Sequence, residues 1–326
     1  MVKVVVPATS ANLGPGFDSL GIALTLYNEF YFQKSNEFAF VNMPKKYSNT
    51  DNLVIRASLK TYEYLNVKPV KYTLEIKSNI PSTRGLGSSA TCIVAGIIIA
   101  SYFSEKKLLP EEIIKIGTEI EGHPDNIAPA VLGALVGTVN CDKIITNKYY
   151  VNPKLIFTIV VPEVKLETSE ARKVLPKELP LEDAIYSLSR AINIPKAIGK
   201  GSIEMLYELL KDKIHQPYRF PLIPDSEKYL QYSRINKIPF CISGSGSCML
   251  FISENSIIEK ITDINKGYEV LELKASIKGG KIYEEWFLGS TQKNMRRKLW
   301  TSNWSKKANK CPKNEYFWSL WENGYK

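Results

Sequence analysis

The feature that most constrains the fold is a segment rich in glycine and serine, Pro81-Ser-Thr-Arg-Gly-Leu-Gly-Ser-Ser-Ala90, which runs directly into the longest apolar stretch of the chain. That stretch, Ala90 to Phe103, has 14 residues, whereas a membrane-spanning helix needs roughly 20. The pattern therefore predicts a buried helix in a globular protein, with a tight loop at its amino-terminal end.

The residue types in this loop are those that bind phosphate. Gly85 and Gly87 allow positive φ angles and a close approach of the backbone to a ligand. Ser88 and Ser89 place hydroxyl and free N–H groups at the positive end of the helix dipole. No Gly-Lys-Ser/Thr follows the glycines, and the spacing differs from that of dinucleotide-binding loops. The alternative, if the Gly/Ser turn is considered alone, is that it has only a structural role at the start of the helix.

A second loop lies near the start of the chain, Val6-Pro-Ala-Thr-Ser-Ala-Asn-Leu-Gly-Pro-Gly-Phe-Asp18. Its polar residues Asn12 and Asp18 are suited to holding an ammonium and a hydroxyl group of a substrate. The alternative is that both side chains only support the turn, which Asn and Asp commonly do.

Two further clusters carry chemistry. The string Glu119-Ile-Glu-Gly-His-Pro-Asp-Asn126 follows a predicted helix, and it combines carboxylates for Mg²⁺ with groups that can position an attacking hydroxyl. The string Ser243-Gly-Ser-Gly-Ser247 separates two apolar runs. A flexible turn is its simplest interpretation, and a second loop facing phosphate or substrate is the functional one.

Charge and composition exclude several function classes. The net charge is +10, but residues 285–326 hold nine Lys/Arg and three Asp/Glu, so the rest of the chain carries about +4. We therefore expect no nucleic-acid partner for the main body. All five tryptophans also lie in 285–326. This segment is interpreted as a loosely ordered tail outside the catalytic unit, with a nucleic-acid or partner-binding arm as the alternative.

Cysteine and histidine usage points to a reducing compartment. The five cysteines form no CxxC pair, and the chain has two histidines, which argues against a disulfide framework and a zinc site. The amino terminus has too short an apolar run for a signal peptide. We expect a cytoplasmic protein without a membrane partner.

Hydrophobic periodicity predicts an α+β fold without a regular βαβ repeat. The polar, turn-rich stretch 140–153 suggests a boundary between an amino-terminal, ATP-binding domain, 1–148, and a carboxy-terminal domain, 149–284. The predicted strands are 3–6, 24–32, 70–77, 133–139, 155–161, 238–242, 248–252 and 269–276. Beyond the helix that follows the loop, the predicted helices are 110–120, 180–197 and 202–211.

Together, the four segments resemble the GHMP kinases, whose phosphate-binding and carboxy-terminal glycine-rich motifs match 81–90 and 243–247. Within that superfamily three strings are similar to those of homoserine kinases: Pro7 to Asp18, Glu121 to Ala130, and His215-Gln-Pro-Tyr-Arg219. The resemblance covers about residues 1 to 283.

The resemblance implies a two-lobed fold, with an amino-terminal lobe like the second domain of ribosomal protein S5 and a ferredoxin-like carboxy-terminal lobe. It implies transfer of the γ-phosphate of ATP, with Mg²⁺, to the hydroxyl of L-homoserine in threonine biosynthesis. A related kinase with a mevalonate- or shikimate-type acceptor is the alternative. The resemblance also allows for a homodimer.

Site roles follow from the same resemblance, position by position. The residues expected around the amino acid are Asn12, Asp18, His123, Thr168, Arg172, Arg219 and Gly244. Those expected to hold ATP are Asn52, Pro81, Arg84, Gly85, Leu86, Gly87, Ser88, Ser89 and Ala90. Ser89 and Glu121 are expected on Mg²⁺.

The identity of the catalytic residue is left open by the pattern Asp125-Asn126, because either side chain can face the acceptor hydroxyl. Related kinases place an aspartate there as a base. We expect Asn126 to face the substrate, so that catalysis depends on positioning and charge stabilisation without a general base.

Overall fold

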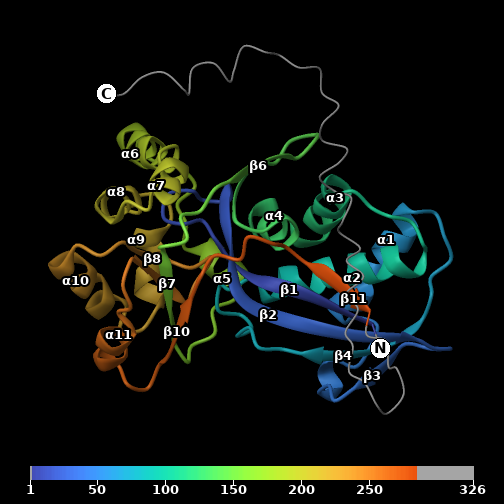
Figure 1. The fold of residues 1–326 in the computed structure, drawn as a ribbon. Helices are drawn as coiled ribbons and strands as arrows, with labels where there is room; N and C mark the ends of the chain where they lie inside the picture. Colours follow the sequence, from blue (N-terminus) through green and yellow to red (C-terminus); the bar gives the residue numbers. More distant parts are fainter. Residues whose placement is uncertain (1, 285–326) are drawn as a thin grey trace.

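The computed structural model describes residues 2–284 of the 326-residue chain. The interpretation of 285–326 as a tail concerns residues that lie outside this range. Two β-sheets and the helices packed on them form the α+β fold that the sequence predicts (Figure 1).

The larger sheet is mostly antiparallel and is built on the long strands β1 and β2. Its order is β11-β1-β2-β4-β3, and β5 pairs with both β2 and β6. Val4 of β1 lies opposite Phe30 of β2, and neither side chain is exposed to solvent. The strands are β1 (Val2–Ala11), β2 (Leu20–Lys34), β3 (Ala39–Val41), β4 (Tyr72–Lys77), β5 (Leu135–Val139), β6 (Ile145–Tyr149) and β11 (Lys281–Glu284).

Four helices cover one face of this sheet (Figure 1). The central one, α2, starts at Ser88 and is buried on nearly every side, as its uniformly apolar sequence predicts. Because α2 packs on α1, α3 and β1, the glycine-rich loop before it is held against the sheet. The helices are α1 (Leu53–Tyr64), α2 (Ser88–Phe103), α3 (Pro110–Glu121) and α4 (Pro124–Leu132).

The second sheet has the antiparallel order β10-β7-β9-β8. One hydrophobic cluster joins the two sheets, because Leu24 of β2 belongs to the same core as Phe157 and Leu250. The strands are β7 (Ile156–Val161), β8 (Phe240–Ile242), β9 (Met249–Ser253) and β10 (Glu269–Leu273). The helices that follow β7 are α5 (Thr168–Lys173), α6 (Leu181–Ala191), α7 (Ile194–Lys200), α8 (Ile203–Leu209), α9 (Gln216–Arg219), α10 (Ser226–Asn236) and α11 (Ile258–Ile264).

One predicted helix was wrong in extent. The stretch 180–197 forms two helices, because α6 ends at Ala191 and α7 begins at Ile194. Pro195, in the first turn of α7, has no N–H group to donate to the carbonyl of Ala191, so α6 cannot continue through this position. The chain therefore turns at Ile192 and Asn193.

Three strands, β3, β6 and β11, lie where the sequence suggests none. Strand β6 lies within the stretch 140–153, where the sequence suggests a domain boundary, and it pairs with β5 of the larger sheet. Strand β11 comes after the last strand of the second sheet but returns to pair with β1. The larger sheet therefore contains residues from both ends of the described chain. None of the described helices combines the length and apolarity required to cross a bilayer.

Candidate functional site

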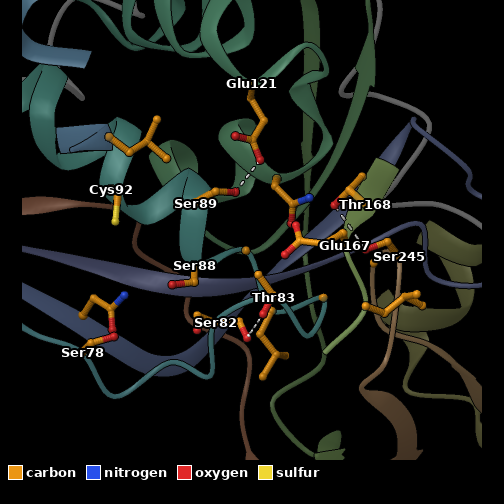
Figure 2. Close-up of a pocket in the computed structure, with 18 of the residues that line it drawn as sticks. Ser78, Ser82, Thr83, Ser88, Ser89, Cys92, Glu121, Glu167, Thr168 and Ser245 are labelled. Carbon is orange, nitrogen blue, oxygen red and sulfur yellow. Dashed lines mark hydrogen bonds between the residues drawn. The ribbon is translucent and has the colours of Figure 1, made fainter. Parts of the chain in front are cut away.

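A cavity of about 650 Å³ lies where the two sheets meet. Its walls come from the loop between β1 and β2, the start of α1, the glycine-rich loop, the α3–α4 turn, α5 and the loop before β9. Figure 2 shows Ser88, Ser89 and Glu121 on one wall, with Thr168 and Ser245 on the other. Sixteen of the residues predicted for the site line this cavity: Asn12, Asp18, Asn52, Gly85, Leu86, Gly87, Ser88, Ser89, Glu121, His123, Asp125, Asn126, Thr168, Arg172, Arg219 and Gly244.

The glycine-rich loop is shaped by its glycines. Gly85 and Gly87 have φ angles of 81° and 65°, in the left-handed region. A Cβ on Gly87 would lie 1.9 Å from the Thr9 hydroxyl oxygen, so only glycine fits there without a shift. Gly87 precedes the first residue of α2, and the N–H groups of a first helical turn have no partners within the helix. The loop therefore presents a helix amino terminus to the cavity.

Three residues expected on ATP do not line the cavity. Arg84 donates from Nε to the Pro162 carbonyl and from Nη2 to that of Glu163, each at 2.9 Å, which ties the loop to the end of β7. Pro81 borders a shallow hollow beside Arg84, and the Ala90 side chain is fully buried. Of the three, Arg84 supports the loop through its hydrogen bonds.

The pair expected on Mg²⁺ is in contact. The Ser89 hydroxyl donates to Glu121 Oε1 at 2.6 Å (Figure 2). Burial raises the pKa of Glu121, and the hydrogen bond from Ser89 opposes that shift. Across residues 2–284, no cluster of three or more His, Cys, Asp or Glu side chains is arranged to hold a metal ion.

The end of the cavity lined by Asp18 and Arg172 has a carboxylate facing a guanidinium. Arg172 donates to both carboxylate oxygens of Asp18, from Nη1 at 3.0 Å and from Nη2 at 2.7 Å. The hydrogen bond to Asp18 raises the pKa of Arg172. These residues are 154 positions apart in the sequence, and only the folded chain brings them together.

Asn12 joins two loops at this end. Its Nδ2 donates to the Gly244 carbonyl at 2.7 Å, and its Oδ1 accepts from the Asp18 N–H at 3.0 Å. Thr168 and Ser245 approach each other with their hydroxyl oxygens 3.4 Å apart (Figure 2). The loop 243–247 therefore forms part of the wall, as one of the two interpretations of its sequence predicts.

Arg219 is 1% exposed, yet it borders the cavity. Its Nε donates to the Ala171 carbonyl at 3.1 Å and its Nη1 to that of Gly244 at 3.3 Å. Within the described chain, its Nη2 makes no hydrogen bond and remains available to a ligand. Burial, with Arg172 nearby, lowers the pKa of Arg219 to about 10. A guanidinium still carries its charge at neutral pH.

The adjacent residues Asp125 and Asn126 have different partners. Asp125 is 2% exposed and its Oδ1 lies 2.6 Å from Nδ1 of His123, which raises the pKa of the imidazole. Asn126 accepts at Oδ1 from the Thr9 hydroxyl at 2.7 Å. Its Nδ2 is not hydrogen-bonded to any described residue. Both side chains line the cavity, so the contacts alone do not identify which one meets an acceptor hydroxyl.

The end of the cavity beside α1 is lined by apolar as well as polar side chains. Asn52 caps α1 by accepting from the Val54 N–H at 3.0 Å, and it donates to the Tyr47 carbonyl at 2.8 Å. Sequence reasoning missed the apolar residues that line this end, including Met43, Tyr47, Leu53, Ile76 and Cys92. No motif identifies them, because apolar side chains in loops and strands usually belong to the core.

Sequence reasoning also missed Phe17, which precedes Asp18 in the loop between β1 and β2. The guanidinium carbons of Arg172 and Arg219 lie 5.4 Å and 5.2 Å from the centre of its ring. These distances are within the range of cation–π attraction. The glycine-rich string Val6 to Asp18 includes this residue, but its position next to two guanidiniums depends on the fold and cannot be predicted from the string.

Comparisons with known proteins agree with this architecture. The family model described as the GHMP kinases N terminal domain matches residues 52–134. A homoserine kinase of Clostridium beijerinckii is 40% identical over 278 residues, which are 84% of this chain and 92% of that protein. A homoserine kinase of Clostridium acetobutylicum is 37% identical over 86% of this chain and 100% of its own length.

Solved structures give the same result. A putative homoserine kinase from Listeria monocytogenes is similar with a TM-score of 0.73 and 28% identity, covering 87% of this chain and all of that one. A homoserine kinase from Cytophaga hutchinsonii has a TM-score of 0.78 at 24% identity, covering 86% of this chain and 96% of that one. The second likeness bears on the fold alone. The chain has the GHMP kinase fold, and it belongs to the homoserine kinase family.

Proposed function

We propose that this chain transfers the γ-phosphate of ATP to the hydroxyl of L-homoserine, giving O-phospho-L-homoserine. One observation carries the proposal: the wall of a single cavity contains a glycine-rich helix terminus, a carboxylate paired with the guanidinium of Arg172, and the second guanidinium of Arg219. The first arrangement suits a triphosphate, and the second suits a zwitterionic α-amino acid.

ATP would be held by the backbone of Gly85 to Ser89, with its base at the apolar end beside Tyr47. The residues present fit Mg²⁺, because Ser89 and Glu121 offer two oxygen ligands 2.6 Å apart beside the phosphate loop. Bound there with phosphate oxygens and water, Mg²⁺ would neutralise charge on the phosphates. The hydrogen bond between Ser89 and Glu121 holds the two side chains that would bind the ion side by side.

The acceptor would bind by exchanging partners with the Asp18–Arg172 ion pair. The ammonium group would go to Asp18 and the carboxylate to Arg172 and Arg219, so each protein charge would find a new partner. An acceptor with a carboxylate but no ammonium group, such as mevalonate or shikimate, would leave Asp18 unpaired beside a second negative charge. The pair therefore favours an amino acid over those alternatives.

For the transfer step, Asn126 would position the hydroxyl with its Nδ2 group. Asp125 would hold His123, whose side chain also lines the cavity. A loose phosphoryl transition state needs little proton abstraction from the acceptor, so positioning and charge stabilisation suffice.

The test is an acceptor screen with the purified full-length chain, ATP and Mg²⁺. Turnover is followed by ADP release, and the product is identified by ³¹P NMR with homoserine, mevalonate and shikimate as separate substrates. We expect O-phosphohomoserine and negligible turnover of the other two. Asp18→Asn should raise the KM for homoserine about tenfold or more, whereas Asp263→Asn, at an exposed ion pair outside the cavity, should not. Faster turnover of mevalonate or shikimate than of homoserine would overturn the proposal.

A further inference from the structure

His215 is a buried imidazole that the roles described so far do not use. It precedes α9, and none of its surface is exposed. The Asp212 carboxylate fixes its backbone by accepting from the N–H groups of His215 and Gln216, both at 2.8 Å. These two hydrogen bonds fix the backbone that carries the imidazole, near the end of the cavity lined by Asp18 and Arg172.

The hydrogen bonds of the ring define its tautomer. Nη1 of Arg219 lies 3.2 Å from Nδ1 of His215, and a guanidinium can only donate, so Nδ1 accepts. Nε2 therefore carries the proton, and it donates to the Gly14 carbonyl at 2.8 Å. Burial also lowers the pKa of His215 to about 4, which keeps the ring neutral near pH 7.

These two bonds connect separate parts of the acceptor site. Gly14 lies between Asn12 and Asp18 in the loop that joins β1 and β2, whereas Arg219 belongs to α9. The imidazole also stacks on Phe17, with ring centres 5.2 Å apart and planes inclined by 27°. Only a neutral aromatic ring with an acceptor on one edge and a donor on the other can make all three contacts.

We propose that His215 is a positioning residue for acceptor recognition: its Nδ1 directs the guanidinium of Arg219 toward the cavity, and its Nε2–H holds the loop from Asn12 to Asp18 against it. The inference rests on the proposed function for the identity of the acceptor. His215 does not line the cavity, so its effect is exerted through Arg219 and this loop.

The experiment uses three substitutions that remove different parts of the ring. In His215→Asn the amide oxygen can replace Nδ1, and in His215→Gln the amide nitrogen can replace Nε2. His215→Phe keeps an aromatic ring against Phe17 but removes both polar atoms. The KM for homoserine, the KM for ATP, kcat and the melting temperature are measured for each variant of the full-length chain.

We expect His215→Phe to raise the KM for homoserine about ten- to a hundredfold, because the bond it removes involves a charged donor. The KM for ATP should stay within about twofold of that of the wild type, since the glycine-rich loop is not in contact with His215. His215→Asn should recover most of the affinity for homoserine and His215→Gln less. Ile261→Ala, on the buried face of α11, serves as a control for general loss of stability.

A merely structural role predicts a different result. It would lower the melting temperature of His215→Phe while leaving the KM for homoserine equal to that of Ile261→Ala, and this outcome would overturn the inference. A parallel rise in both KM values would overturn it as well. If the wild type does not use homoserine, the proposed function fails. Crystal structures of the Phe and Asn variants would then test the inference separately. It predicts that the Arg219 guanidinium moves in the Phe variant and keeps its position in the Asn variant, and an unmoved guanidinium in both would overturn it.

Discussion

At the scale of single residues, the roles of Asp125 and Asn126 can be separated by substitution. We expect Asn126→Ala to lower kcat by about a hundredfold, because it removes the group that positions the hydroxyl. Asp125→Asn should lower kcat by about tenfold, because His123 loses a charged partner at 2.6 Å but no base is removed. Steady-state kinetics at saturating ATP and homoserine provide the measurement.

The opposite ranking would assign the base to Asp125. A general base contributes roughly 10²- to 10⁴-fold, so a loss of several orders of magnitude in Asp125→Asn alone would contradict catalysis by positioning. Thr9→Val is a useful companion variant. It removes the hydroxyl that donates to Asn126 at 2.7 Å and should reproduce part of the defect of Asn126→Ala.

The buried imidazole of His215 also predicts how stability depends on pH. Its pKa falls from 6.5 to about 4 on folding, mainly through burial. Between these pH values the unfolded chain binds a proton at this site and the folded chain does not. Its contribution to the free energy of unfolding is therefore complete above pH 6.5 and decreases as the pH falls toward 4, by roughly 3 kcal/mol.

Urea unfolding at pH 7 and pH 4.5 of the wild type and His215→Phe measures this contribution. The difference in unfolding free energy between the two proteins should shrink at the lower pH, because only the wild type has the imidazole. An unchanged difference would mean that the pKa of His215 is not lowered. His123→Gln is the control, since hydrogen bonding to Asp125 raises the pKa of that imidazole.

Single residues were predictable wherever a local string carries them. Asn12, Asp18 and the loop residues 85–89 were predicted from neighbouring residues, and all of them line the cavity. The Asp18–Arg172 pair and the position of Phe17 were not predictable, because each joins segments that are distant in the sequence. Arg84 looked like a ligand residue, but its guanidinium donates to backbone carbonyls of another segment.

At the scale of elements, the junction of the glycine-rich loop with α2 can be tested at Gly87. An alanine there would place its Cβ 1.9 Å from Oγ1 of Thr9 at a φ of 65°, so the loop or β1 must shift. We expect Gly87→Ala to raise the KM for ATP about tenfold or more and to lower stability by about 1 kcal/mol or more. The KM for homoserine should change less.

The matched control is Gly199→Ala. Gly199 lies in α7, and its added Cβ would make only ordinary contacts, the nearest being 3.5 Å from the Tyr150 carbonyl oxygen. Because alanine favours helix over glycine by about 1 kcal/mol, this variant should be at least as stable as the wild type, with both KM values unchanged. Equal effects of the two alanines on the KM for ATP would contradict the assigned role of the loop.

Elements were predictable where their hydrophobic pattern is strong. Strands β1, β2, β4, β5, β7, β8, β9 and β10 all overlap predicted strands, and α2 and α3 follow their predicted ranges closely. Helix α1 was missed because its buried face includes Ser58 and Thr61, whose hydroxyls donate to the Ile55 and Ala57 carbonyls at 2.8 Å. Hydroxyls satisfied within their own helix can be buried without disturbing the core, but they conceal the periodicity in the sequence.

At the scale of the whole molecule, the two ends of the described chain meet in one sheet. Val4 of β1 lies between Phe30 of β2 and Ile282 of β11. Ile282 is 8% exposed and belongs to the same core as α2. No local pattern predicts this pairing, because the register depends on a partner strand almost 280 residues away. Strand β11 therefore belongs to the larger sheet, although it follows residue 148 in the chain.

The pairing of β11 with β1 predicts where the chain can be shortened. The residues that line the cavity all precede Lys281, and β11 ends at Glu284. A chain ending at 284 should therefore keep the homoserine-dependent turnover of the full chain. A chain ending at 279 should be less stable by about 2–5 kcal/mol, because it loses Ile282 from the core and uncovers the edge of β1.

Comparing both truncated chains with the full chain separates the strand from the residues beyond it. Turnover and urea unfolding are measured for the three chains under the same conditions. Loss of turnover in the chain ending at 284, with its unfolding free energy unchanged, would show that residues 285–326 take part in catalysis. If the chain ending at 279 were as stable as the full one, β11 would not contribute to the core. The expected order of stability follows from the position of Ile282 at the junction of sheet and helices.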